Sequence, residues 1–289
     1  PAAFLTPYFN TETQFRIGSI SKTFTATLIM QLIEEGRLSL STRLSSFFPQ
    51  FPAADTITID HLLTHSSGLH NFTNDLLYFS YIDSSMSRAS MLTIMADPPL
   101  DFAPGSKHEY SNANYVLLGY ILEEVTGKPY AQLLDERIVQ PLGLNRTAYG
   151  DAIEVYKNET VSWVWQSDGW APPGIPTTDM SIPHGAGGVV STAAELTAFL
   201  RALWQGELIA AESIETMCTL EEGFGKGLFR FPYGNDKEAW GHNGGIDAFL
   251  NQASYFPEED MAIAFTLSGS RLGLNQLALI ILSYVFNEP

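Results

Sequence analysis

The sequence predicts an α+β fold in which an antiparallel sheet flanked by helices faces a mostly helical lobe. Two observations predict this arrangement. Helical patterns dominate the middle of the chain, and short apolar runs separated by turn residues gather near its end. With 289 residues, of which 45% are hydrophobic, the chain can also bury a large core.

The first helix is predicted over residues 23–35, where apolar side chains recur at every fourth position. Gly36 follows as a natural C-terminal stop. This helix is apolar on nearly every side, which predicts a central position rather than a surface one. A second helix is predicted over about residues 113–125, between a Pro-Gly turn and Gly127.

The later part of the chain begins with an irregular stretch over residues 150–188. Thr192 and Glu195 then form the pattern of a capping box, in which each side chain accepts a hydrogen bond from the other residue's free backbone N–H. Residues 239–270 have the apolar runs and turns of antiparallel strands, and residues 274–286 predict a closing helix.

Composition excludes several classes of partner. The net charge is −17 although only 16% of residues are charged, so the surface repels nucleic acid and anionic membrane surfaces. No segment approaches the ~20 apolar residues of a membrane helix, so no integral membrane segment is expected. Cys218 is the single cysteine, which excludes an internal disulfide framework and a cysteine metal cluster.

Ser19 and Lys22 stand three residues apart where the first apolar helix begins. A Ser-x-x-Lys match is expected about once by chance in a chain of this length, so the pair alone is compatible with an ordinary polar helix start. Its placement favours chemistry, because residues three apart share one helix face. A central apolar helix would remove the lysine from water and lower its pKa. The N–H groups at the helix start would also stabilise a developing oxyanion.

Other catalytic designs fit less well. The chain has no Gly-x-Ser-x-Gly elbow and no Gly-rich phosphate loop. His61 and His65 lie four apart and could share a helix face as metal ligands. The metalloprotease pattern requires Glu directly after the first histidine, however, and Leu62 stands there. Structural, hydrogen-bonded histidines are the alternative, and no metal site is predicted.

The chain resembles the serine hydrolases related to penicillin-binding proteins, DD-peptidases and class C β-lactamases. Five segments carry the resemblance in the family's order: TQFRIGSISKTFTATLIMQLIEEGRLSL, TIDHLLTHSSGL, FAPGSKHEYSNANYVLLGYILEEVTGKPY, GAGGVVSTAAELTAFL and GHNGG. Together they cover nearly the whole chain. The resemblance implies a β-lactamase/transpeptidase-like fold and hydrolysis through an acyl-enzyme, without a metal or organic cofactor.

The resemblance also implies roles for the first two motifs. Ser19 would be the nucleophile and Lys22 would take or relay its proton. Tyr110 would share that duty and protonate the leaving group. Which of Lys22 and Tyr110 is the base stays open at this point, because coupled groups titrate as a unit. Asn112 would hold the substrate amide and Lys22. Without the other motifs, Tyr110 could be a buried ring and Asn112 a helix N-cap.

The third motif is His242-Asn243-Gly244, which the resemblance places in the substrate-binding site. The backbone N–H groups of Ser19 and Gly245 would form the oxyanion hole, and the glycines at 244 and 245 would permit close approach. The alternative for His242 is a turn residue. The better-known motif is Lys-Thr-Gly. A histidine is mostly neutral near pH 7, which puts efficient β-lactam hydrolysis in doubt.

The resemblance implies one catalytic domain over residues 1–289. Its sheet lobe would comprise about residues 1–60 and 190–289, and its helical lobe about residues 61–189. Only 18 residues precede Ser19, so the N-terminal strands that usually come before the first motif are expected to be missing from this chain. Relatives are often exported, but the sequence shows no export signal.

For function, the sequence favours a DD-carboxypeptidase or a related D-amino-acid peptidase acting on a small-molecule or peptide substrate. A carboxylesterase or weak β-lactamase is one alternative, and a penicillin- or peptidoglycan-binding protein with little turnover is another. A carboxypeptidase needs a cation for the terminal carboxylate, and Arg230 and Arg271 are the candidates, with ordinary surface arginines as the alternative. The tryptophans at positions 163, 165 and 170 could roof the pocket or pack in a core.

Overall fold

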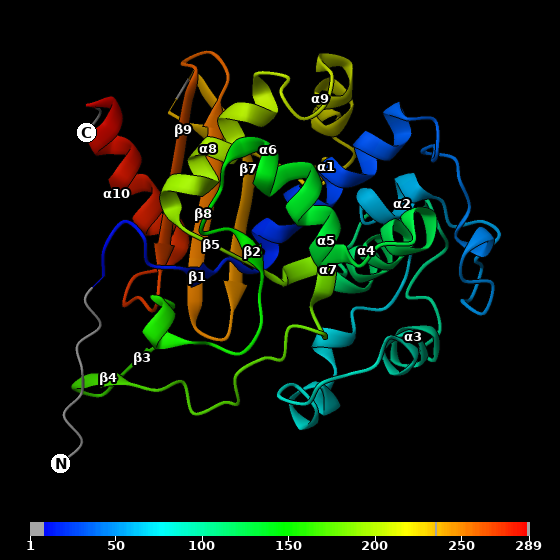
Figure 1. Ribbon diagram of the computed structural model, residues 1–289, viewed down its shortest axis with the longest axis horizontal. Helices are drawn as coiled ribbons and strands as arrows, with labels where there is room; N and C mark the ends of the chain where they lie inside the picture. Colours follow the sequence, from blue (N-terminus) through cyan, green and yellow to red (C-terminus); the bar gives the residue numbers. More distant parts are fainter. Residues whose placement is uncertain (1–8, 235, 288–289) are drawn as a thin grey trace.

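The computed structural model describes residues 9–234 and 236–287. Its main sheet is antiparallel, with the strand order β6-β7-β8-β9 (Figure 1). Side chains alternate between the faces of a strand. Tyr255 of β8 accordingly stacks on Trp204 of α8, whereas Ser254 and Phe256 face α10 on the other side. The bounds are β6 (Phe229–Tyr233), β7 (Lys237–Ile246), β8 (Phe249–Phe256), β9 (Met261–Leu267), α8 (Ala193–Trp204) and α10 (Leu274–Phe286).

Two smaller sheets complete the strands of the described residues. One has the order β1-β5-β2 and attaches the segment before Ser19 to the middle of the chain. The other is a hairpin of β3 and β4. The bounds are β1 (Phe15–Arg16), β2 (Ala148–Tyr149), β3 (Val164–Gln166), β4 (Gly169–Ala171) and β5 (Val189–Ser191).

Helix α1 (Ser21–Glu34) lies in the centre of the molecule, where it contacts β7 on one side and α4 and α7 on the other (Figure 1). Eleven of its residues are buried, as its nearly continuous apolar pattern predicts. Further α-helices are α2 (Ile59–Leu63), α3 (Arg88–Ala96), α4 (Asn112–Thr126), α5 (Tyr130–Leu134), α6 (Gln140–Leu142), α7 (His184–Gly187) and α9 (Ala211–Cys218). Single 3-10 turns occur at Gly18–Ile20, Leu44–Ser46, Phe72–Asn74, Leu76–Ser80 and Val155–Lys157, and a π-helical turn occurs at Asp135–Val139.

The predicted α+β fold is confirmed. Helix α1 begins two residues earlier than predicted and ends before Gly36, whose φ of +69° suits a glycine at a helix end. Helix α4 ends at Thr126 with Gly127 as its C-cap, and α10 spans the predicted residues. The predicted strand region holds β7, β8 and β9. The predicted lobe boundaries stay a prediction, and their ends at residues 1–8 and 288–289 lie outside the described residues.

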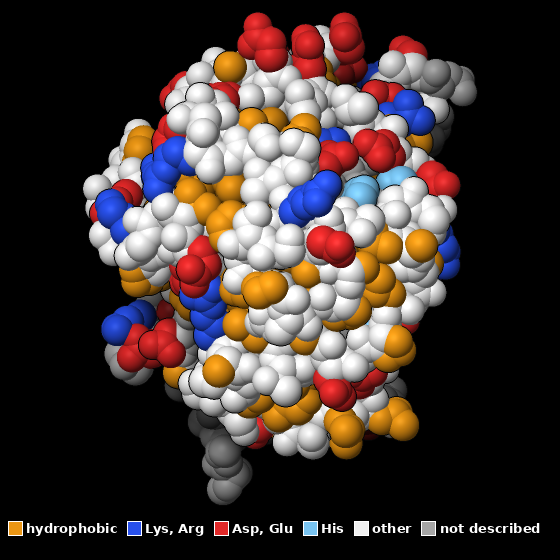
Figure 2. Space-filling model, turned by 90° about the vertical axis from the view of Figure 1, so that its right-hand side faces the viewer, with side chains coloured by type: hydrophobic (Ala, Val, Ile, Leu, Met, Phe, Trp, Pro, Cys, Tyr) orange, Lys and Arg blue, Asp and Glu red, His pale blue; other side chains and the backbone are white. Residues whose placement is uncertain are grey.

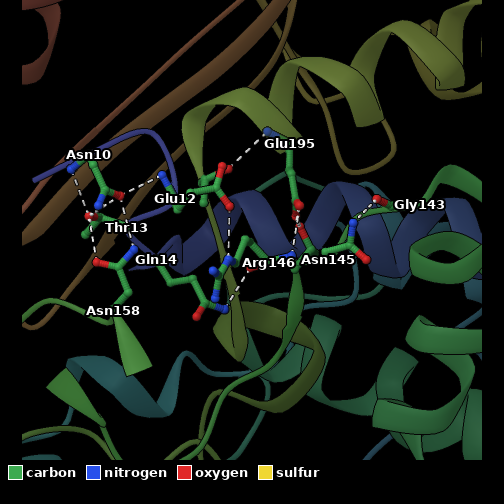
Figure 3. Close-up of polar contacts among 11 residues, drawn as sticks. Asn10, Glu12, Thr13, Gln14, Gly143, Asn145, Arg146, Asn158 and Glu195 are labelled. Atoms are coloured by element: carbon green, nitrogen blue, oxygen red, sulfur yellow. Dashed lines mark hydrogen bonds and ion pairs between the residues drawn. The ribbon is translucent and has the colours of Figure 1, made fainter. Parts of the chain in front are cut away.

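The predicted capping box at α8 is only half formed. Thr192 Oγ1 accepts a hydrogen bond from the backbone N–H of Glu195 at 3.2 Å. The Glu195 carboxylate does not return to Thr192. It accepts the backbone N–H of Arg146 at 2.8 Å (Figure 3). It also accepts the hydroxyl of Thr147 at 2.6 Å. The carboxylate therefore joins α8 to the segment before β2, where two donors need an acceptor.

The surface agrees with the acidic composition. Figure 2 shows acidic side chains gathered at the upper edge of one face and separate apolar patches lower down. Among the residues that the structure describes, no helix combines the length and the apolar character needed to cross a membrane.

Candidate active site

Ser19 lies in the 3-10 turn that runs directly into α1, so its side chain stands at the start of a buried helix. Lys22 follows in the first turn of α1, and its Nζ donates a hydrogen bond to Ser19 Oγ at 3.0 Å. The spacing of three residues thus brings the amine to the hydroxyl, as the sequence predicted.

Lys22 is fully buried. Besides Ser19 Oγ, its Nζ reaches Asn112 Oδ1 at 2.8 Å and the carbonyl oxygen of Ala186 at 2.7 Å. None of these three partners carries a charge. Burial without a carboxylate partner lowers the pKa of Lys22 well below its ordinary value. The lowered pKa favours an uncharged amine, whose two hydrogens suffice for Asn112 and Ala186 while its lone pair can accept the proton of Ser19.

Tyr110 approaches Ser19 from the loop before α4. Its hydroxyl donates a hydrogen bond to Ser19 Oγ at 2.7 Å. The phenol ring stacks on His65, with ring centroids 4.5 Å apart. Burial raises the pKa of Tyr110, so the phenol keeps its proton near neutral pH. Tyr110 is thus suited to donate a proton, and Lys22 to accept one.

The two histidines considered as metal ligands have other contacts. His61 Nδ1 accepts the backbone N–H of Thr58 at 3.3 Å, and the two residues form a capping box at α2. His65 Nδ1 accepts the backbone N–H of Ser111 at 3.1 Å. Within residues 9–234 and 236–287 no group of three or more His, Cys, Asp or Glu side chains could hold a metal ion. His65 instead supports the ring of Tyr110.

Asn112 is the first residue of α4, and the N-cap is Ser111, so the alternative assignment of Asn112 as the cap is wrong. With its Oδ1 on Lys22, its Nδ2 donates to Thr73 Oγ1 at 3.1 Å. Its backbone N–H donates to Asn71 Oδ1 at 3.0 Å. Thr73 thus orients the side-chain amide, and Asn71 holds the backbone of Asn112. Sequence reasoning missed both, because no motif marks them and only the fold brings them to α4.

Strand β7 passes very close to the nucleophile segment. A Cβ on Gly244 would lie 1.9 Å from the carbonyl oxygen of Ile17 and 3.2 Å from Ser19 N. A Cβ on Gly18 would lie 2.8 Å from the carbonyl oxygen of Gly245. A Cβ on Gly245 would lie 3.9 Å from the carbonyl oxygen of Phe249, which is ordinary contact distance. The close approach therefore requires glycine at 244 and 18, whereas the expectation that Gly245 is needed for space is wrong.

His242 is a buried residue of β7 paired with Ala253, so the alternative of a turn residue is wrong. Its ring centroid lies 4.7 Å from that of Phe229 and 6.3 Å from that of Tyr110. Burial is the main cause that lowers the pKa of His242 to about 3. The imidazole is therefore neutral near pH 7. Asn243 follows in the same strand, and its part in substrate binding stays a prediction.

The arginines and tryptophans considered for the substrate pocket make contacts that do not involve Ser19, Lys22 or Tyr110. Arg230 forms an ion pair with Glu238 at 3.2 Å. Arg271 lies over the ring of Trp165, 4.3 Å from its centroid, beside an open hollow of about 540 Å³. Trp163 and Trp165 line that hollow, and Ser19, Lys22 and Tyr110 do not. The suggested roof over the active site has no support in these contacts.

Comparison with known proteins matches residues 7–276 to the family model described as "Beta-lactamase". The putative penicillin-binding protein PbpX of Bacillus subtilis (strain 168) is 30% identical over 225 residues, which are 77% of this chain and 55% of that protein. The chain spans about half the length of the curated relatives it matches.

Two solved structures share the fold over most of their length. A D-stereospecific amidohydrolase from Streptomyces sp. is 28% identical with a TM-score of 0.83, covering 94% of this chain and 86% of that one. The D-amino acid amidase from Ochrobactrum anthropi SV3, complexed with L-phenylalanine amide, is 26% identical with a TM-score of 0.85, covering 96% and 85%.

Proposed function

Since the chain belongs to the β-lactamase family of serine acyl-transfer hydrolases, we propose that it hydrolyses amide or peptide bonds on the carbonyl side of D-amino acids. The observation that carries the proposal is the contact of Ser19 Oγ with both Lys22 Nζ and Tyr110 Oη. The two related D-amino-acid hydrolases support the substrate class.

In the proposed reaction, uncharged Lys22 takes the proton of Ser19 while Oγ adds to the substrate carbonyl carbon. The N–H groups of Ser19 and Gly245 hold the resulting oxyanion. Collapse of this intermediate breaks the C–N bond, and Tyr110 gives its proton to the departing nitrogen. The Lys22 ammonium then returns a proton to the Tyr110 oxygen. Water attacks the acyl-Ser19 ester by the same steps, which releases the acid and restores the serine.

The electrostatics favour a substrate without a free carboxylate beside the cleaved bond. Lys22 is proposed to be uncharged, and the lowered pKa of His242 keeps that imidazole neutral. Arg230 and Arg271, the cations considered from the sequence, are held by Glu238 and Trp165. A D-amino acid amide therefore fits better than a peptide ending in D-Ala-D-Ala, for which a carboxypeptidase would need a cation.

A substrate panel tests this proposal. We expect D-phenylalanine amide to be hydrolysed with a higher kcat/KM than L-phenylalanine amide and than release of D-alanine from a D-Ala-D-Ala peptide. Ser19→Ala is the control and should abolish all turnover. Hydrolysis of p-nitrophenyl esters without any amide hydrolysis would favour the esterase alternative. Labelling of Ser19 by a penicillin without turnover of any substrate would favour the binding-protein alternative.

A further inference from the structure

Arg16 and Asp247 form a nearly buried ion pair next to the candidate active site. Arg16 Nη1 lies 3.2 Å from Asp247 Oδ2, and the two side chains are 3% and 4% exposed. In the sequence, Arg16 stands three residues before Ser19 and Asp247 two residues after Gly245. A buried ion pair costs desolvation energy and gives little net stability, so its position calls for another explanation.

The pair joins four segments of the chain, those around Arg16, Asp151, Thr178 and Asp247. Arg16 Nη1 also donates to the carbonyl oxygen of Thr178 at 2.5 Å, and Nη2 donates to that of Asp151 at 3.0 Å. Asp247 Oδ1 accepts the backbone N–H of Thr178 at 3.0 Å and its hydroxyl at 2.7 Å. These bonds fix the turn between β7 and β8, where Asp247 has a φ of +53°.

Asn251 of β8 makes a second connection between the same two segments. It is fully buried, and its Nδ2 donates to the carbonyl oxygens of Arg16 at 3.0 Å and Gly244 at 3.3 Å. One amide group thus joins the backbone before Ser19 to the backbone before Gly245. The close approach of Gly244 to the carbonyl oxygen of Ile17 occurs in the same two backbone segments.

We propose that Arg16, Asp247 and Asn251 are positioning residues that set the separation of the Ser19 and Gly245 N–H groups in the oxyanion hole. This inference rests on the proposed function, because it requires those two groups to bind the oxyanion. The Arg16–Asp247 ion pair and the Asn251 amide both hold the backbone segments that carry the N–H groups of Ser19 and Gly245. Donors of an oxyanion hole act only over a narrow range of distances, so a small displacement lowers the rate without touching Ser19, Lys22 or Tyr110.

The test compares a p-nitrophenyl ester with its thionoester, in which sulfur replaces the carbonyl oxygen. Sulfur accepts hydrogen bonds weakly and lies farther from carbon, so the thionoester gains little from a well-placed oxyanion hole. In Asp247→Asn, a donor group replaces one carboxylate oxygen, and either Arg16 or Thr178 loses its acceptor. We expect kcat/KM for the ester to fall about 10²-fold, the order of losing one oxyanion-hole donor. The thionoester rate should change much less.

Asn251→Ser provides a second variant that leaves the ion pair intact and should shift the ester-to-thionoester ratio in the same direction. Asp60→Asn is the matched control, because it removes the carboxylate that pairs with the buried Lys226 at 3.1 Å. This control should have the same ratio of ester to thionoester kcat/KM as the parent protein. The pH at which acylation is half-maximal should stay unchanged in Asp247→Asn and Asn251→Ser, since Lys22 and Tyr110 are intact.

The results separate this inference from the proposed function. If the parent protein acylates Ser19 but the ester and thionoester rates fall in parallel, or neither falls, in the folded variants, the positioning role is wrong. If Asp247→Asn does not fold, the ester-to-thionoester ratio of Asn251→Ser decides whether the positioning role holds. If the parent protein forms no acyl-enzyme on Ser19 with either ester, the proposed function itself fails.

Discussion

The Tyr110 hydroxyl lies 2.7 Å from Ser19 Oγ, although 91 residues separate them in the sequence. Lys22 Nζ lies 3.0 Å from the same oxygen. Burial moves the pKa values of the two flanking groups in opposite directions, down for Lys22 and up for Tyr110. Pairs of groups whose pKa values are driven apart in this way are suited to divide the work of base and acid.

Replacing the amine tests the proposed base. In Lys22→Met, we expect acylation of Ser19 to slow by about 10²–10⁴-fold, the usual contribution of general acid–base catalysis. The fold should persist because methionine is uncharged in a fully buried site. Pre-steady-state release of p-nitrophenol measures the acylation rate. Lys107→Met is the control, because Lys107 is exposed and pairs with Glu109, and it should react like the parent protein.

The pH profile gives the same assignment independently. Lys22 acts without its proton, so acylation should rise with pH and level off above the pKa of Lys22. Because burial lowers that pKa well below its ordinary value, the plateau should begin far below pH 10. A plateau reached only near pH 10 would argue against Lys22 as the base.

Tyr110→Phe should affect amides more than activated esters. The departing nitrogen of an amide needs a proton, whereas p-nitrophenolate leaves without one. We therefore expect kcat/KM to fall by about 10²-fold or more for an amide and by clearly less for a p-nitrophenyl ester. Steady-state assays of both substrates measure the difference. Equal losses for the two would show that Tyr110 does not protonate the leaving group.

Two neighbouring glycines make a matched pair for the close approach of β7. In Gly244→Ala, the new Cβ would lie 1.9 Å from the carbonyl oxygen of Ile17, so β7 must move away and activity should be lost. In Gly245→Ala, the new Cβ would lie 3.9 Å from the carbonyl oxygen of Phe249, so thermal stability should stay close to that of the parent protein. Thermal denaturation compares the two variants, and ester hydrolysis checks the loss of activity in Gly244→Ala. A greater loss of stability in Gly245→Ala than in Gly244→Ala would contradict the described packing.

Protonation of His242 should contribute to acid unfolding. Its pKa is about 3 in the folded protein, below the ordinary 6.5, so the unfolded state binds the proton more readily between these values. The free energy of unfolding should therefore fall as the pH drops from 6.5 towards 3, by up to about 1.4 kcal/mol per pH unit from this group. His242→Asn should show a shallower fall in urea titrations at pH 7, 5.5 and 4.5.

His70 is the control for that experiment, because its pKa shifts the other way. Hydrogen bonds to Asp101 and Asp75 raise the pKa of His70, so its protonation favours the folded state. His70→Gln should therefore lose more stability than the parent protein on acidification. If both variants changed the pH dependence in the same direction, the assignment of His242 would be wrong.

Much of the fold follows from local patterns. The period of α1, the glycines after α1 and α4, and the apolar runs of β7 to β9 are signals within short segments. Strand β6 was not predicted, because Arg230 and Pro232 interrupt its apolar pattern and its partner lies in β7. The capping box predicted from Thr192 and Glu195 formed only in part, because the backbone N–H of Arg146, distant in the sequence, binds the Glu195 carboxylate.

The candidate site divides in the same way. Ser19 and Lys22 could be paired from helix spacing alone, whereas the contact with Tyr110 required the family motifs. The supporting residues Asn71, Thr73 and Asp247 carry no motif, because long-range packing alone brings them to the site. Burial could be anticipated for Lys22, whose helix is apolar, but the stacking of His65 on Tyr110 could not.

The most direct test of the central claim is intact-protein mass spectrometry after reaction with a fluorophosphonate probe. The account predicts one added phosphonyl group per chain, located on Ser19 by peptide mapping, and no adduct in Ser19→Ala. It also predicts that Lys22→Met reacts far more slowly, although its serine is unchanged. An adduct of equal yield in Ser19→Ala would contradict the account.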